Sequence, residues 1–201
     1  AGLYFEASYV GGVPIIRTLL DGVQANEISS MMGIINGTTN YILTKMTEEG
    51  RSYEDCLKEA QRLGYAEADP TADVEGYDAA YKLSILSSLA FHTKVPFTKI
   101  YREGISNVTK EDIADGKELG YVLKLLAIGK QSDAGIEVRV HPTFVRKGHP
   151  LASVNDSFNA VFLTGDSVGD IMLYGRGAGA LPTGSAIVSD INYAAPHSEN
   201  K

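Results

Sequence analysis

The chain has 201 residues, of which 44% are hydrophobic and 21% charged, a composition typical of a globular protein that buries its own core. A formal net charge of −7 and scattered basic residues argue against nucleic acid or an anionic membrane as the main partner. No run approaches the roughly 20 apolar residues of a membrane span, and the single cysteine, Cys56, cannot form an internal disulfide, so we expect a cytoplasmic protein.

The first half of the chain is predicted to combine strands with amphipathic and buried helices. In chain order, the patterns indicate a strand at 3–8, a helix at 13–23, a buried strand at 27–36, and helices at 38–50, 52–63 and 77–91. Thr38 and Thr39 are candidate caps of the helix at 38–50, and this strand-to-helix junction is a candidate edge of a ligand pocket. Gly64 ends the next helix and permits close approach of the backbone to a ligand.

The second half is predicted to be rich in strands. A short helix begins near Thr109, and apolar or alternating runs then indicate strands at 121–128, 136–141, 160–164 and 170–174. The turn signal at residues 132–135 joins the first two of these strands. The order of elements predicts an α+β fold, with a mixed, largely antiparallel sheet and helices layered on one face.

The densest chemistry lies at residues 64–82, GYAEADPTADVEGYDAAYK, where five carboxylates lead into an apolar helix that carries one lysine. Asp78 and Lys82 are four residues apart, so they lie on one face of this helix and within reach of each other. A buried lysine suits proton transfer near neutral pH, and an adjacent aspartate can orient it. The spacing is equally compatible with a solvent-exposed salt bridge, which contributes little to stability.

A glycine-rich turn, GRGAGA at residues 175–180, follows the last predicted strand. It matches the G-x-G-x-x-[GA] pattern of dinucleotide-binding folds, which also need a second strand and an acidic residue about 20 residues further on. No second strand is predicted here, and Asp190 falls within the last helix. A complete nucleotide-binding fold is therefore rejected, although the helix N-terminus can still point at part of a cofactor.

Four motifs in this chain resemble those of the homoserine dehydrogenase family. They are FEAS with GGVP (5–14), GTTNYIL (37–43), GYAEADPTADVEGYDAAYKLSIL (64–86) and GAGALPT (177–183). The resemblance implies an oxidoreductase that interconverts L-homoserine and L-aspartate 4-semialdehyde with NAD or NADP, in threonine, methionine and isoleucine biosynthesis. It further implies that residues 1–201 are the catalytic, substrate-binding and dimerisation domain of a homodimer, a fragment that lacks the family's N-terminal nucleotide-binding domain and is inactive alone.

The resemblance also implies roles for individual residues. Lys82 is expected to accept the hydroxyl proton, with Asp78 orienting it, and Asp69 and Asp73 are candidates for the same network. The expected substrate contacts are Glu67, Asp78, Tyr65 and Thr38. The expected cofactor contacts are Gly64, Gly177 and Gly179. The expected ligands of a monovalent cation such as sodium are Glu6 and the backbone carbonyls near Tyr9, Gly11 and Val13.

Two other functions remain compatible with the sequence. One is a related NAD(P)-dependent enzyme that acts on another amino-acid-derived aldehyde. The other is a non-catalytic module that binds an amino acid or dimerises, and it would show no catalytic dependence on Lys82. The presence of Glu67, Asp78 and Lys82 together disfavours the non-catalytic module.

Overall fold

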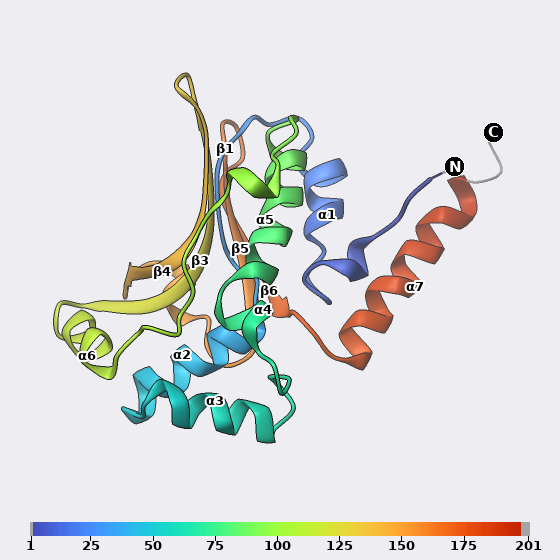
Figure 1. Cartoon of the computed structure of the whole chain (residues 1–201). Helices are drawn as coiled ribbons and strands as arrows, with labels where there is room; N and C mark the ends of the chain where they lie inside the picture. The colour runs from blue at the N-terminus through green and yellow to red at the C-terminus, as the bar shows by residue number, and fades with distance from the viewer. Residues whose placement is uncertain (1, 198–201) are drawn as a thin grey trace.

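The computed structural model describes residues 2–197, with side chains to residue 195 (Figure 1). The strands are β1 (Ile28–Ile34), β2 (Tyr101–Arg102), β3 (Tyr121–Ser132), β4 (Gly135–Arg146), β5 (Phe158–Gly165) and β6 (Gly169–Arg176). The α-helices are α1 (Ile15–Arg17), α2 (Gly37–Glu49), α3 (Tyr53–Arg62), α4 (Thr71–Val74), α5 (Tyr77–Ala90), α6 (Lys110–Glu118) and α7 (Ala180–His197). Shorter turns are η1 (Glu6–Ser8), the π-helical η2 (Thr18–Gly22), η3 (Phe97–Lys99) and η4 (Pro150–Ser153).

The six strands form one sheet in the order β2-β4-β3-β1-β5-β6. Two hairpins, β3–β4 and β5–β6, lie on either side of β1, which pairs antiparallel with β3 and β5. Among the strands of residues 2–197, only the two-residue β2, which the sequence did not predict, pairs in parallel, with β4. The predicted α+β fold with a mixed, largely antiparallel sheet is therefore confirmed.

The main core lies between one face of the sheet and the helices, among which α2 and α5 both contact β3 (Figure 1). It includes Ile42 of α2, Leu83 of α5 and Leu125 of β3. A smaller cluster forms on the opposite face, where Leu151 of η4 packs near Leu126. The helices thus leave much of this second face without a helical layer, as the sequence predicted.

Local capping explains where several helices begin. Ser52 accepts a hydrogen bond from the amide of Asp55 at the start of α3, and Thr109 and Asp112 form a reciprocal capping box at α6. The prediction that threonines cap α2 is wrong, because the helix begins at Gly37 and Asn36 accepts from the amide of Thr39. An Asn side chain satisfies this N-terminal donor as well as a threonine would.

The predicted strand at residues 3–8 is also wrong. Glu6–Ser8 forms the 3-10 turn η1, and the amide of Glu6 donates to Oδ2 of Asp190 rather than to a neighbouring strand. This contact ties the N-terminal segment to α7, which stands beside it and away from the sheet (Figure 1). Within residues 2–197, none of the helices combines the length and apolar character needed to cross a membrane.

Candidate active site

Asp78 and Lys82 form an ion pair on the first turns of α5. Nζ of Lys82 donates to Oδ2 of Asp78 at 2.8 Å and to the carbonyl oxygen of Ile35 at 3.1 Å. The Lys82 side chain is 21% exposed and that of Asp78 is 30% exposed, so the pair is neither fully buried nor freely solvated. An ammonium has three N–H bonds, and two are used here, which leaves one that can point at a ligand.

Asn36 connects this pair to a second carboxylate. Its Nδ2 donates to Asp73 at 2.7 Å and to Asp78 at 2.9 Å, while its Oδ1 accepts from the amide and hydroxyl of Thr39. One buried amide therefore places two carboxylates side by side and is itself fixed by the start of α2. The predicted participation of Asp73 in the network agrees with this geometry. Asn36 was not predicted, although an Asn before a helix-initiating glycine is a capping signal that pointed to it.

A cavity of about 490 Å³ opens beside these groups, within the range usual for small-molecule sites. Lys82, Asp78 and Asp73 all line it. Its other lining residues are Ile35, Asn36, Gly37, Thr38, Gly64, Tyr65, Ser157, Asn159, Arg176, Gly177, Ala178 and Gly179. The structure therefore brings together the residues that follow β1, the start of α2, the segment after α3, the helices α4 and α5, the start of β5, the end of β6 and the turn before α7.

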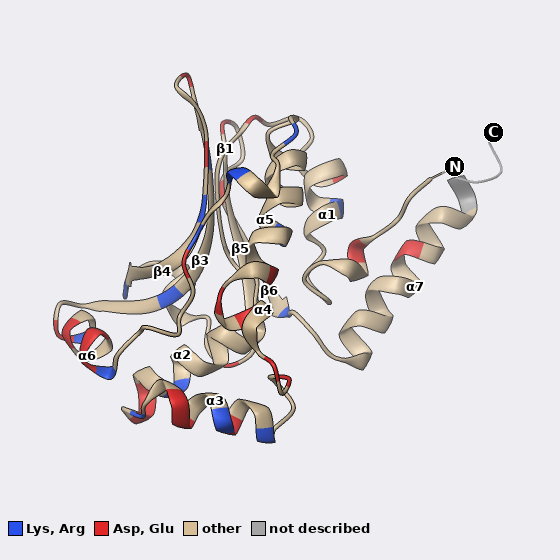
Figure 2. Ribbon diagram, in the orientation of Figure 1, with Lys and Arg blue, Asp and Glu red and all other residues tan. Residues whose placement is uncertain are grey.

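The predicted substrate contacts divide into two groups. Thr38 and Tyr65 line the cavity, and the Thr38 hydroxyl donates to the Tyr65 carbonyl oxygen at 2.6 Å. Glu67 is exposed and does not line it, and Asp69 instead accepts from the amide and hydroxyl of Thr71. The connection between α3 and α5, to which Glu67 belongs, is visibly acidic (Figure 2).

The glycines expected to contact a cofactor all line the cavity. A Cβ at Gly177 would lie 1.6 Å from Oδ1 of the buried Asn159, so any other residue there would displace the Asn159 side chain. Gly11 has a φ of 51°, and its Cβ would lie 2.6 Å from the carbonyl oxygen of Gly177. The amide of Gly12 also donates to the carbonyl oxygen of Arg176 at 2.9 Å. Two glycine-rich turns, far apart in sequence, thus pack backbone to backbone at the edge of the cavity.

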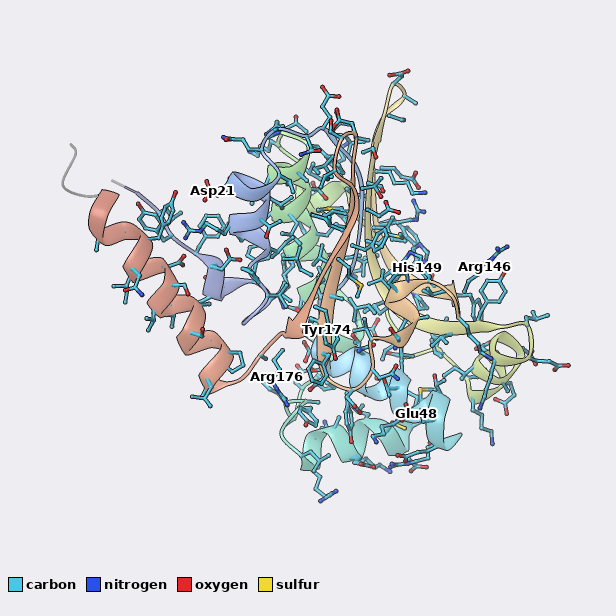
Figure 3. All side chains as sticks on the ribbon, turned by 180° about the vertical axis from the view of Figure 1, so that it is seen from behind. Asp21, Glu48, Arg146, His149, Tyr174 and Arg176 are labelled. Atoms are coloured by element: carbon cyan, nitrogen blue, oxygen red, sulfur yellow. The ribbon has the colours of Figure 1, made fainter. Side chains whose placement is uncertain are left out.

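Three further lining residues, Ser157, Asn159 and Arg176, were not predicted. Arg176 stands at the end of β6, where the chain leaves the sheet for α7, and its guanidinium lies 5.0 Å from the Phe158 ring (Figure 3). Its place within the GRGAGA turn was an available signal. Ser157 and Asn159 had no such signal, because only the tertiary fold places the start of β5 beside α2.

The residues expected to bind a cation lie around η1. The carboxylate of Glu6 is buried and accepts from the amides of Ile16 and Arg17 at 2.9 and 2.7 Å. Burial raises the pKa of Glu6, and the two amide donors oppose that rise. The phenol of Tyr9 donates to the Lys82 carbonyl oxygen at 3.2 Å, so this region contacts helix α5, which carries Lys82 and Asp78. One carboxylate with nearby carbonyls is a donor set suited to a hard cation, and Val13 and Gly11 lie in the same turn.

These features define an α+β ligand-binding domain whose cavity presents a lysine–aspartate pair. The profile of the homoserine dehydrogenase family matches residues 14–191. A homoserine dehydrogenase of Bacillus subtilis (strain 168) is 52% identical over 189 residues, which cover 94% of this chain and 44% of that protein. The chain belongs to the homoserine dehydrogenase family, and it spans less than half the length of the curated relatives it matches.

Solved structures give the same result. A homoserine dehydrogenase from Thiobacillus denitrificans matches with a TM-score of 0.91 and 52% identity, covering 92% of this chain and 43% of that chain. A hyperthermophilic archaeal homoserine dehydrogenase in complex with NADPH matches with a TM-score of 0.84 and 30% identity, covering 98% and 56%. The fold is therefore that of the corresponding part of these enzymes.

Proposed function

We propose that this chain is the catalytic, substrate-binding and dimerisation portion of a homoserine dehydrogenase, which interconverts L-homoserine and L-aspartate 4-semialdehyde using NAD or NADP. The observation that carries the proposal is the Lys82–Asp78 pair at the cavity, fixed by Asn36, in a chain of this family. Oxidation of the alcohol removes a hydride from carbon and a proton from oxygen. In the lysine–aspartate pair, the amine of Lys82 is the group that accepts this proton.

Lys82 accepts the hydroxyl proton in its neutral form, and in the reverse direction its ammonium returns that proton to the carbonyl oxygen. Asp78 orients Lys82 through the 2.8 Å hydrogen bond, and Asn36 fixes Asp78. When the aldehyde is reduced, the positive charge of the Lys82 ammonium also stabilises the alkoxide that develops on the carbonyl oxygen. A nicotinamide cofactor, held at Gly64, Gly177 and Gly179, would supply the hydride acceptor or donor.

The substrate is a zwitterion, and the carboxylates of the cavity suit its α-ammonium group. Asp78 and Asp73 line the cavity, and Tyr65 and Thr38 contribute polar atoms from the same side. Glu67 is included in the proposed substrate site because it closely follows Gly64 and Tyr65, which line the cavity.

The cofactor portion of the proposal rests on Gly64, Gly177 and Gly179, which line the cavity without side chains that would obstruct a ring. The NADPH complex of the archaeal relative supports a nicotinamide cofactor. A monovalent cation such as sodium at Glu6, Tyr9, Gly11 and Val13 completes the proposed site. We also infer that the enzyme is cytoplasmic, on the basis of its single cysteine.

The proposal is tested by homoserine-dependent reduction of NAD and NADP by the longer chain of which these residues would form part. We expect reduction with L-homoserine and little with alcohols that lack the α-ammonium group, because the carboxylates of the cavity would then gain no ion pair with the ligand. Preference for another amino alcohol would favour the related-substrate enzyme instead. A folded long chain that reduces neither NAD nor NADP with any amino alcohol would favour the non-catalytic module.

A homodimer is proposed on the face of the sheet that lacks a helical layer. Met32, Phe162 and Met172 are in register across β1, β5 and β6, and Met172 and Tyr174 are 37% and 53% exposed. Such an apolar row is typical of surfaces that become buried on association. We expect Met172→Asp to convert a dimer to a monomer in light scattering, whereas Asp170→Asn should not. A wild-type monomer would contradict the proposal.

A further inference from the structure

Lys124 on β3 is a buried cation that the proposed chemistry does not use. Its side chain is 0% exposed. Nζ donates to the carbonyl oxygen of Val154 at 2.5 Å, to Oδ1 of Asn155 at 3.1 Å and to Oδ1 of Asn40 at 3.2 Å. None of the ion pairs found among residues 2–195 includes it. All three partners are neutral oxygens, and two of them belong to one short segment.

The residues from Val154 to Phe158, here called the 154–158 segment, connect η4 to β5 and are fixed from α2 as well. Nδ2 of Asn40 donates to the carbonyl oxygens of Val154 and Phe158 at 3.0 and 3.1 Å. The amide of Asp156 donates to the hydroxyl of Thr44 at 3.1 Å. Lys124 and Asn40 therefore act on the same segment, and each also bonds the other.

Two anionic groups approach this cluster from its outer side. Nδ2 of Asn155 donates to Oε1 of Glu48 at 3.4 Å, and Glu48 stands at the end of α2 (Figure 3). Burial lowers the pKa of Lys124 to about 8, and the charges of Glu48 and Asp156 oppose this effect. The protein thus retains a lysine whose charge is costly to bury and which has no carboxylate in direct contact.

The 154–158 segment leads directly to the cavity. Ser157 and Asn159 both line it. Gly37, the first residue of α2, packs so closely that a Cβ there would lie 3.0 Å from the Ser157 carbonyl oxygen. Nδ2 of Asn159 donates to the Ile34 carbonyl oxygen at 2.9 Å, and its Oδ1 lies against Gly177. A shift of this segment would move both the Gly37 and the Gly177 edges of the cavity.

We propose that Lys124 is a positioning residue for the active site, whose ammonium fixes the 154–158 segment and thereby the cavity edge formed by Ser157 and Asn159. This inference rests on the proposed function and extends it to a residue outside the cavity. It assigns the buried lysine to ligand affinity rather than to proton transfer. Lys124 acts through Ser157 and Asn159 and contacts no ligand itself.

The test compares Lys124→Met with Lys130→Met in the longer chain. Both lysines lie on β3, but Lys130 is exposed and serves as the matched control. We expect Lys124→Met, which loses three hydrogen bonds, to raise KM for homoserine on the order of tenfold, the equivalent of about one hydrogen bond, with kcat changed less than about threefold. The melting temperature should change little, because relief from burying a charge is offset by the three oxygen acceptors that lose their donor.

Asn40→Leu gives an independent variant. If both residues act through the 154–158 segment, the double variant should raise KM no more than the larger single effect, since coupled sites are not additive. A KM for Lys124→Met within about twofold of wild type, or a loss confined to kcat, would overturn the inference. So would fully additive effects of the two substitutions.

Hydrogen exchange separates this inference from the proposed function. The amides of Asp156 and Phe158 donate to Thr44 and to the Asn155 carbonyl oxygen. We expect both amides to exchange faster in Lys124→Met and at the wild-type rate in Lys130→Met, whether or not homoserine is the substrate. Wild-type exchange in Lys124→Met would overturn the inference even in an active enzyme.

Discussion

Two lysines of this protein occupy opposite kinds of environment. Lys82 is partly exposed, pairs with Asp78 and lines the cavity, whereas Lys124 is fully buried and bonds only neutral oxygens. Each also donates to one backbone carbonyl oxygen, that of Ile35 or of Val154. Two N–H bonds of Lys82 are used within the protein, which leaves one for a ligand in the cavity, whereas all three N–H bonds of Lys124 are used. A lysine whose donors all bond the protein can only fix structure.

The largest expected effect is at Lys82. In the longer chain, Lys82→Ala should lower kcat by about two orders of magnitude or more, the upper part of the range for a positioned acid–base group. The melting temperature should change little, because the side chain is partly exposed. Steady-state kinetics and thermal unfolding check this, with Lys130→Ala as the control. Equal turnover in mutant and wild type would reassign Lys82 to a merely structural ion pair and remove the contrast between the two lysines.

An intermediate effect is expected at Asn36, which links Asp73 to Asp78. Asn36→Ser keeps an oxygen that can cap α2 but loses the amide that donates to both carboxylates. We expect kcat to fall about tenfold, the equivalent of one or two lost hydrogen bonds, with only a small change in melting temperature. Asn36→Ala should lose the cap as well and unfold at a lower temperature. If the serine variant turns over like wild type, Asp78 does not need Asn36 for its placement.

The smallest effect is a pH dependence of stability that comes from Lys124. Its pKa of about 8 in the folded protein lies below the ordinary value, so the unfolded chain binds more protons above pH 8. The contribution of Lys124 to stability should therefore rise with pH, by on the order of 1 kcal/mol between pH 8 and pH 9. The free energy of unfolding of wild type should therefore rise relative to that of Lys124→Met over this interval, as measured by urea unfolding. A difference that is constant with pH would mean that Lys124 is not desolvated.

Local sequence patterns predicted most of the secondary structure. The i, i+4 spacing of Asp78 and Lys82, the capping pattern of Ser52 and the turn before Gly135 are properties of a few neighbouring residues. One error arose because a distant partner intervened, whereas the wrong cap of α2 came from overlooking the neighbouring Asn36. Residues 3–8 form no strand, because the amide of Glu6 bonds Asp190 of α7.

The sequence by itself determined the family motifs, the order of elements and the lysine–aspartate pair, since each depends on residues close together in the chain. Only the tertiary structure decided that Asn36 bridges two carboxylates, that Gly11 packs against Gly177, and that Lys124 is buried beneath the 154–158 segment. The residues in each of these contacts are separated by 30 or more positions in the chain. No local periodicity encodes which distant oxygen a buried N–H will meet, because packing of the whole core determines that choice.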